Sequence, residues 1–178
     1  MGDEKTVRIL SALLFLITSS QAEDWPQYLG PGRDAVWREQ KVELDFVKRP
    51  PRQVWSVPVG SGYAGPSVVD GRVFVMDRLA KPYIAGKLKP GSNVNFVRAR
   101  IPGKERVRCL RETNGEVLWE HSYEADYSSV YPYAIGPRTT PLVHKGMVYT
   151  LGAEGHLHAY SAEDGKVVWQ RNILKEYE

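Results

Sequence analysis

The chain reads HAYSAEDGKVVW from His158 to Trp169, and RCLRETNGEVLW from Arg108 to Trp119, 50 positions earlier. A second pair of matching stretches is PLVHKGMVYTL from Pro141 to Leu151 and PSVVDGRVFVM from Pro66 to Met76, 75 positions apart. Within each pair, residues such as Gly, Pro and Trp occupy matching positions. Self-similarity of this kind is typical of repeat proteins, in which equivalent modules stack on one another.

The two spacings differ by 25 residues, so the first copy carries an insertion of about that length. The insertion falls between roughly Asp77 and Glu105, because the copies match on either side of it. A shorter partial match, Gln53-Val-Trp55, resembles the ending of each copy. We therefore expect a repeat region over 53–178, with two full repeats at about 65–122 and 139–172.

Each repeat is predicted to form four short strands. In the second repeat these cover roughly 140–144, 147–152, 155–161 and 166–172, which are rich in β-branched and aromatic residues. Two turns between them, Lys145-Gly146 and Asp164-Gly165, end in a glycine that supplies the positive φ of a tight hairpin. Four strands in a repeat of this length are typical of a β-propeller blade.

The sequence therefore predicts an all-β fold: a partial β-propeller of four-stranded antiparallel blades. It would hold about two blades plus one strand of another blade, around Gln53 to Val59. A β-sandwich of seven or eight strands is the alternative, which the detailed repetition disfavours. Two blades and a fraction cannot close a ring and leave apolar faces uncovered. We expect the N-terminal part of a longer protein, or a short unit that forms a ring from several copies.

The N-terminus is typical of an exported protein. Two basic residues precede an apolar run from Ile9 to Ile17, and Ser20 and Ala22 stand where a signal peptidase needs small residues. The run is too short to span a bilayer, and a buried helix here would lack an end cap. We interpret 1–22 as a signal peptide and 23–52 as an extended segment. The mature chain is expected in the bacterial periplasm or at the cell surface, without a transmembrane segment.

Composition excludes several classes of protein. The 178 residues are 42% hydrophobic with a net charge of +3, which disfavours intrinsic disorder. The 16 Gly and 12 Pro disfavour a helical bundle, and the single Cys excludes an intrachain disulfide framework or a Cys-rich zinc module. The charge is also too small and too dispersed for a typical nucleic-acid module, so we expect no nucleic-acid partner.

Ala159, Gly165, Lys166 and Trp169 together resemble the tryptophan-docking motif of the pyrroloquinoline-quinone (PQQ) repeat. That repeat occurs in quinoprotein dehydrogenases and in BamB-like propeller proteins of bacterial envelopes. DWPQYLGP at 24–31 and GPRTTP at 136–141 resemble other parts of exported members. The motif usually carries an Asp two residues after the Ala, where this chain has Ser161. The resemblance implies that the indoles stack on adjacent blades and that these residues are structural: Trp55, Trp119, Trp169, Gly115, Gly165 and Ala159.

Three long segments are expected on one face, because the connections in a four-stranded meander alternate between its ends. They are Gly60 to Gly65, the insertion, and Tyr123 to Arg138. Long loops on a rigid scaffold commonly carry function. Basic residues there would suit an anionic partner, although they could also belong to a solvated loop. Tyrosines there could stack on sugar rings or a quinone, or could pack over the blade junction instead. The candidate contacts are Arg78, Lys81, Arg98, Arg100, Tyr127, Tyr131 and Tyr133.

Other candidates carry less information. Arg138, at the start of a predicted inner strand, is the best single candidate for an anion or cofactor contact. His156 and His158 share one face of a strand and could bind a metal, but surface histidines are the simpler interpretation, and no metal site is predicted. Cys109 aligns with Ala159 and is expected to be packed. Residues 60–65 match GxGxxG, but a strand follows where a dinucleotide site needs a helix.

The resemblance favours a non-catalytic binding or assembly scaffold in the bacterial envelope, with a protein or an anionic glycan or other envelope component as partner. No residue is assigned a catalytic role. One alternative is a degenerate repeat protein with no ligand, and the other is a fragment of a PQQ-dependent alcohol or sugar dehydrogenase. That class needs PQQ, an Asp base and Ca²⁺ held by oxygen ligands, and none of these can be placed on matching positions.

Overall fold

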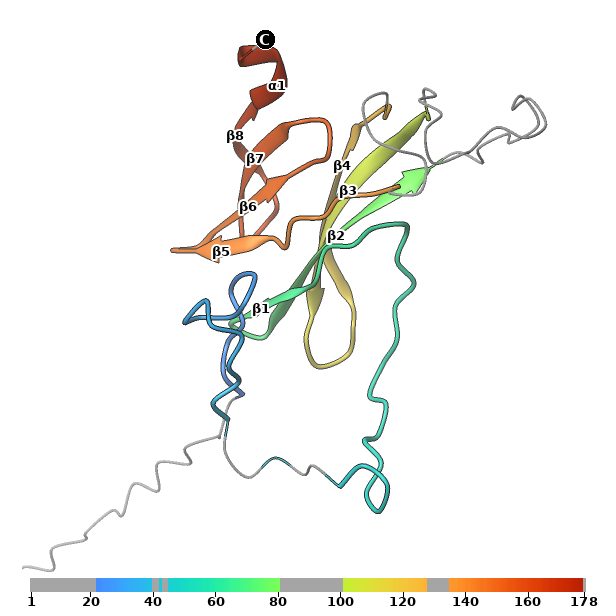
Figure 1. The fold of residues 1–178 in the computed structure, drawn as a ribbon, viewed down its shortest axis with the longest axis vertical. Coiled ribbons are helices and arrows are strands. Elements are labelled where there is room, and N and C mark those ends of the chain that lie inside the picture. The colour runs from blue at the N-terminus through green and yellow to red at the C-terminus, as the bar shows by residue number, and fades with distance from the viewer. Residues whose placement is uncertain (1–21, 40–41, 43–44, 81–100, 128–134, 178) are drawn as a thin grey trace, which may run out of the picture.

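The computed structural model of the chain describes residues 22–39, 42, 45–80, 101–127 and 135–177. It holds two four-stranded antiparallel sheets, each in sequential strand order (Figure 1). The first sheet, blade 1, consists of β1 (Ser67–Val69), β2 (Arg72–Ala80), β3 (Gly103–Arg111) and β4 (Val117–Glu124). The second, blade 2, consists of β5 (Leu142–His144), β6 (Met147–Leu151), β7 (His156–Ser161) and β8 (Val167–Asn172), followed by the short helix α1 (Ile173–Glu176). The predicted all-β architecture of four-stranded blades is confirmed.

The two blades are equivalent in their turns as well as in their strands. The turn between the first two strands is Asp70-Gly71 in blade 1 and Lys145-Gly146 in blade 2, and all four residues have positive φ. Two consecutive residues with positive φ give the type I′ turn that matches strand twist. Each blade also has a register shift at the same repeat position, after Cys109 and after Ala159. The repetition in sequence is therefore a repetition in backbone geometry.

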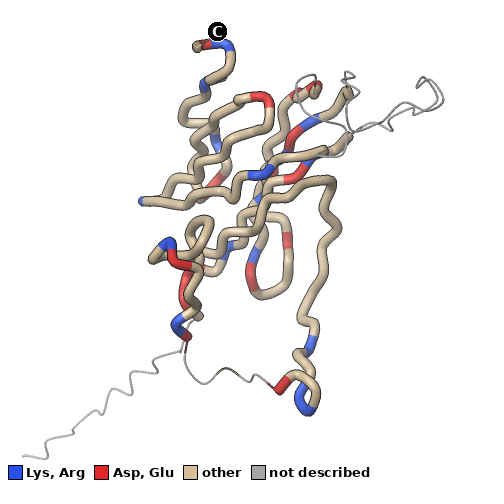
Figure 2. Tube along the Cα trace, viewed as in Figure 1, with Lys and Arg blue, Asp and Glu red and all other residues tan. Residues whose placement is uncertain are grey.

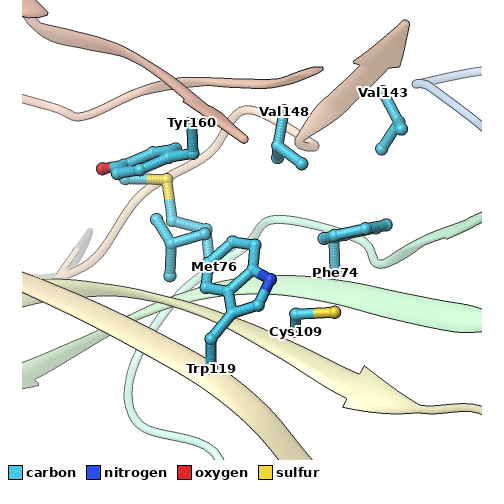
Figure 3. Close-up of a cluster of buried hydrophobic side chains, with 8 residues drawn as sticks. Phe74, Met76, Cys109, Trp119, Val143, Val148 and Tyr160 are labelled. Atoms are coloured by element: carbon cyan, nitrogen blue, oxygen red, sulfur yellow. The ribbon is translucent and has the colours of Figure 1, made fainter. Parts of the chain in front are cut away.

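The apolar core lies between the blades rather than within either one (Figure 3). Blade 1 contributes Phe74, Met76 and Trp119, and blade 2 contributes Val148 and Tyr160 to the same buried cluster. The Trp119 ring lies 6.0 Å from Phe74 and 6.1 Å from Tyr160, measured between centroids. Because one sheet cannot bury both of its faces, each blade depends on its neighbour for stability.

Trp55 and Trp119 each dock on the glycine turn of the following blade. The Trp119 indole N–H donates to the carbonyl of Ala162 at 3.0 Å, and the Trp55 indole N–H donates to the carbonyl of Glu112 at 2.6 Å. Both carbonyls stand three residues before the turn glycine, Gly165 or Gly115. A Cβ on either glycine would lie within 2.7 Å of the docked ring. Glycine at these turns is therefore required by contact as well as by conformation.

Two predicted boundaries differ from the structure. Residues 53–59 form no paired strand, because the described residues include no neighbouring strands of the blade to which they would belong. Blade 1 also continues further than expected into the insertion: β2 and β3 stay in register from Asp77–Arg106 to Ala80–Gly103. The extra residues are thus confined to about 81–102, of which 81–100 lie outside the described residues.

The described N-terminal residues form a hook along the inner strands, β1 and β5, which begin each blade (Figure 1). Trp25 pairs with Val68 through two backbone hydrogen bonds of 2.7 and 3.0 Å. The next carbonyl, of Pro26, accepts from the N–H of Val143 in β5 at 2.8 Å. The hook, residues 23–35, therefore joins the two blades at their inner edges. The predicted signal peptide lies almost entirely outside the described residues.

Candidate binding surface

The three long segments meet at one end of the sheets. Ser61 forms an antiparallel bridge with Arg78, and Ile101 forms one with Tyr127. The N–H of Tyr63 donates to the carbonyl of Pro137 at 2.8 Å, which ties the first segment to the third. Side chains from distant parts of the sequence are thus brought together here.

Arg78 and Tyr127, two residues predicted on exposed binding loops, are buried instead. Arg78 belongs to β2 and is 1% exposed, and its guanidinium lies 3.9 Å from the centroid of the Tyr127 ring. Its Nη2 donates to the carbonyls of Ile101 and Ala125, at 2.6 and 3.0 Å. Burial lowers the pKa of Arg78, because desolvation disfavours the charged form. The expectation of a solvated contact is wrong for these two residues, because Arg78 packs against the Tyr127 ring and donates to the carbonyls of Ile101 and Ala125.

Glu105 is the buried acidic centre of this region and joins the two blades. It accepts the hydroxyl of Tyr123 at 2.6 Å and the hydroxyl of Tyr127 at 2.5 Å. It also accepts the N–H of Ala153, in the β6–β7 turn of blade 2, at 2.9 Å. Burial and this carboxylate raise the pKa of both tyrosines well above the ordinary value, so both remain hydroxyl donors. The arrangement is a structural network rather than an open site.

The basic residues of β3 are also engaged internally. Arg106 contacts the Asp77 carboxylate through two nitrogens, at 2.9 and 2.6 Å, and Arg108 donates to the carbonyl of Pro58 at 2.8 Å. Burial raises the pKa of Asp77, but the bonds from Arg106 and Gly60 outweigh it, so this pKa lies below its ordinary value. Acidic and basic residues are interspersed along the described chain (Figure 2). The other five candidates, Lys81, Arg98, Arg100, Tyr131 and Tyr133, lie outside the described residues.

An apolar hollow of about 470 Å³ opens beside the hook, next to the inner strands. Trp25 and Leu29 form one wall, and Pro66 and Val68 of the β1 region form another. Its rim carries two strongly exposed rings, Tyr28 at 70% and Tyr63 at 62%. The remaining lining is Ala35, Gly65, Arg138 and Thr140.

The hook that forms this hollow is conformationally strained. Leu29, Arg33 and Ala35 all have positive φ, between 54° and 64°, although none is glycine. Each such residue costs roughly 1–2 kcal/mol relative to a right-handed conformation. Gly30 is tightly held as well, because a Cβ there would lie 2.7 Å from the Trp25 ring. Strain of this kind persists where the surrounding structure enforces it and is common at binding sites. We call this feature, with its rim, the hook hollow.

Arg138 is the predicted cofactor or anion contact, and the structure places it in the lining of the hook hollow. Its side chain is exposed, and no described residue forms an ion pair or hydrogen bond with it. The described residues of the lining include no carboxylate and no side-chain amide. The hollow can therefore attract an anion, but the side-chain oxygens of its described lining are hydroxyls, with no carboxylate for Ca²⁺, so it does not fit the calcium–quinone pair of the alternative enzyme class.

The histidines are the functional candidates that sequence reasoning misjudged. His158 is 3% exposed and lies at the interface between the blades, so it is not a surface residue. Its alternation with Tyr160 along one strand could have indicated a buried face. Among the described residues, no three His, Cys, Asp or Glu are grouped so that they could hold a metal ion. Cys109 is fully buried, and burial raises its pKa to about 11, which makes it a poor nucleophile at neutral pH.

The repeat family is identified by comparison with known protein families. The sequence profile of a family described as outer membrane protein assembly factor BamB matches residues 45–176, which is well over half of the chain. A solved structure of BamB from Moraxella catarrhalis is 17% identical, with a TM-score of 0.31. That match covers 67% of this chain and 37% of the other, so this chain spans well under half of that protein's length. A search of curated proteins found no match. Within the described residues, no helix is long and apolar enough to cross a membrane.

Proposed function

Because the chain belongs to the PQQ-like repeat family described as BamB, we propose that it is part of an exported β-propeller that acts as a non-catalytic binding scaffold. Export is supported by the signal-like N-terminus and by the outer-membrane role in the family's description. N-terminal sequencing of the protein from cells tests export, with Glu23 as the expected first residue. A chain that retains Met1 would contradict it.

The hook hollow is the proposed binding site, and a protein segment is the proposed partner. The observation that carries this proposal is that exposed Tyr28 and Tyr63 share an apolar hollow with Arg138, which has no ion-pair partner among the described residues. Tyr and Arg are enriched among the residues that dominate binding energy at protein interfaces. An apolar or aromatic side chain would fill the hollow, and a neighbouring carboxylate would pair with Arg138.

The test uses a small probe of that chemistry. The peptide acetyl-Ala-Leu-Phe with a free carboxylate should shift the indole N–H NMR signal of Trp25 saturably, because Trp25 lines the hollow. Arg138→Ala should weaken this binding about tenfold, the effect of losing one charge-assisted hydrogen bond. The amidated peptide should bind the wild type and Arg138→Ala equally. Lys145→Ala is the matched control, since Lys145 is exposed but lies outside the hollow.

Two further ligands separate the alternatives. The first is a uronic-acid oligosaccharide. If it shifts the Trp25 signal and the peptide does not, the partner is an acidic glycan rather than a protein. PQQ with Ca²⁺ should give no bound-quinone absorbance change, because the described lining offers no carboxylate. Such a change, or equal weakening by Arg138→Ala and Lys145→Ala, would refute the proposed function.

A further inference from the structure

A continuous row of imidazole and phenol rings fills the boundary between the blades. Because side chains alternate along a strand, β4 presents Trp119, His121 and Tyr123 on one face, and β7 presents His156, His158 and Tyr160 on the face opposite. The five His and Tyr rings interleave, and we call them the His–Tyr seam. None of the proposed functions uses them.

The contacts across the seam are close. The His158 ring centroid lies 4.5 Å from Tyr123 and 6.0 Å from His121, and Tyr160 lies 5.1 Å from His121. Tyr123 also lies 5.2 Å from His156. Within β7, the His158 and Tyr160 rings are nearly parallel, at an interplanar angle of 12°. Every blade-to-blade contact in this row therefore involves at least one imidazole.

The buried nitrogens of the seam have unused hydrogen-bonding capacity. The Nδ1 atoms of His156 and His158 have no hydrogen-bond partner among the described residues. Neutral imidazoles tolerate such a setting better than imidazolium ions, because burying an unpaired charge is far more costly than burying a dipole. Burial lowers the pKa of His121, and burial together with the two neighbouring imidazoles lowers the pKa of His158.

Among the described residues, no carboxylate around the seam is free to neutralise a protonated histidine. Glu105 from β3 accepts three donors, Glu124 from β4 pairs with Lys104 at 3.0 Å, and Glu176 from α1 pairs with Arg171 of β8. Glu154, in the β6–β7 turn, is also engaged. The other polar groups that line the outer end of the seam are Gln170, Arg171, Asn172 and Lys175, two of which are cationic.

We propose that the His–Tyr seam makes the docking of blade 2 on blade 1 dependent on pH: the docking is tight when His121 and His158 are neutral and loosened when they are protonated. The direction follows from linkage. A histidine whose pKa is lower in the folded state stabilises that state above the unfolded value of about 6.5, and this contribution is lost as the pH falls below it. The blade boundary would therefore loosen in acidified surroundings.

The Trp119 indole N–H reports opening directly, because its bond to the Ala162 carbonyl crosses the boundary. We expect its hydrogen exchange in the full chain, corrected for the intrinsic pH dependence, to be at least tenfold faster at pH 5.0 than at pH 7.5. The double variant His121→Gln/His158→Gln should lose this acceleration, because glutamine does not titrate. His144→Gln is the control and should retain it, since His144 is exposed in β5, away from the seam.

Two results would overturn the proposal. The first is an equal acceleration in the wild type and in the double variant. The second needs no variant, so it holds even if the double variant does not fold: an NMR titration of the wild type in which His121 and His158 titrate at or above the ordinary histidine value. Titration below that value, with loss of acceleration in the double variant, supports the proposal.

Discussion

The glycine that receives a docked indole must satisfy two separate requirements: a positive φ and the absence of a side chain. Gly165 has a φ of +70°, and a Cβ there would lie 2.5 Å from the Trp119 ring. Gly146 has a similar φ of +74°, but a Cβ there would meet nothing within 4 Å. The two positions therefore separate the cost of backbone conformation from the cost of blocking an indole.

Gly165→Ala is expected to lower the free energy of unfolding by about 2–4 kcal/mol, through the left-handed conformation and the displaced indole together. Gly146→Ala should lower it by only about 1 kcal/mol, the conformational part alone. Urea unfolding of both variants, followed by tryptophan fluorescence, measures the difference. Equal losses would show that indole docking contributes nothing at Gly165.

At the scale of elements, blade 1 and blade 2 are joined at three levels. The hook ties β1 to β5 through the backbone of Trp25 and Pro26. The core and the Trp119 indole join the middle of the sheets, and Glu105 ties β3 to the β6–β7 turn. Of these, Glu105 is the connection through a charged side chain, and a buried carboxylate with three donors is expensive to disturb.

Glu105→Gln should lower the free energy of unfolding by about 2–3 kcal/mol, because an amide places N–H groups against donors that then lack an acceptor. Glu124→Gln is the matched control on the next strand. Its carboxylate is exposed and pairs with Lys104, so the loss should be at most about 1 kcal/mol. Urea denaturation measures both. A loss at Glu105 no larger than at Glu124 would contradict the assignment of Glu105 as a link between blades.

At the scale of the whole molecule, the equivalent tryptophans differ in their exposure to solvent. Trp119 is 8% exposed, whereas Trp169, its repeat equivalent, is 40% exposed, and its neighbour Val168 is 56% exposed. Within the described residues, no blade follows β8, so no turn glycine receives the Trp169 indole. The outward face of blade 2 thus exposes an indole that is equivalent to the buried indole of Trp119.

Trp119→Ala should therefore cost about 3–5 kcal/mol of stability, the range for a buried tryptophan. Trp169→Ala should cost about 1 kcal/mol in this chain, since much of its surface is already in water. Thermal and urea unfolding of the two variants test this. Similar losses would mean that Trp169 is covered in solution, and the oligomeric state would then need to be measured.

Much of the fold was predictable because its signals are local. Paired turn residues such as Asp70-Gly71 and Lys145-Gly146, followed by β-branched runs, specify each hairpin from a few neighbouring residues. The docking partners of Trp119 could be inferred from repetition, because equivalent residues occupy equivalent places. The prediction of a strand around Gln53 was wrong because it rested on a local pattern alone. A strand also needs neighbouring strands with which to form hydrogen bonds.

The sequence by itself determined the repeated four-stranded modules, their turns and the identity of the structural tryptophans. Only the tertiary structure decided which polar residues are buried. Arg78 looked like a loop cation and His158 like a surface histidine, yet Tyr127 covers the first and the rings of β4 cover the second. It also placed Arg138 beside Trp25, more than 100 positions away. Hydrogen bonding within a hairpin depends on adjacent residues, whereas burial and ion pairing depend on segments that meet only after the blades have stacked.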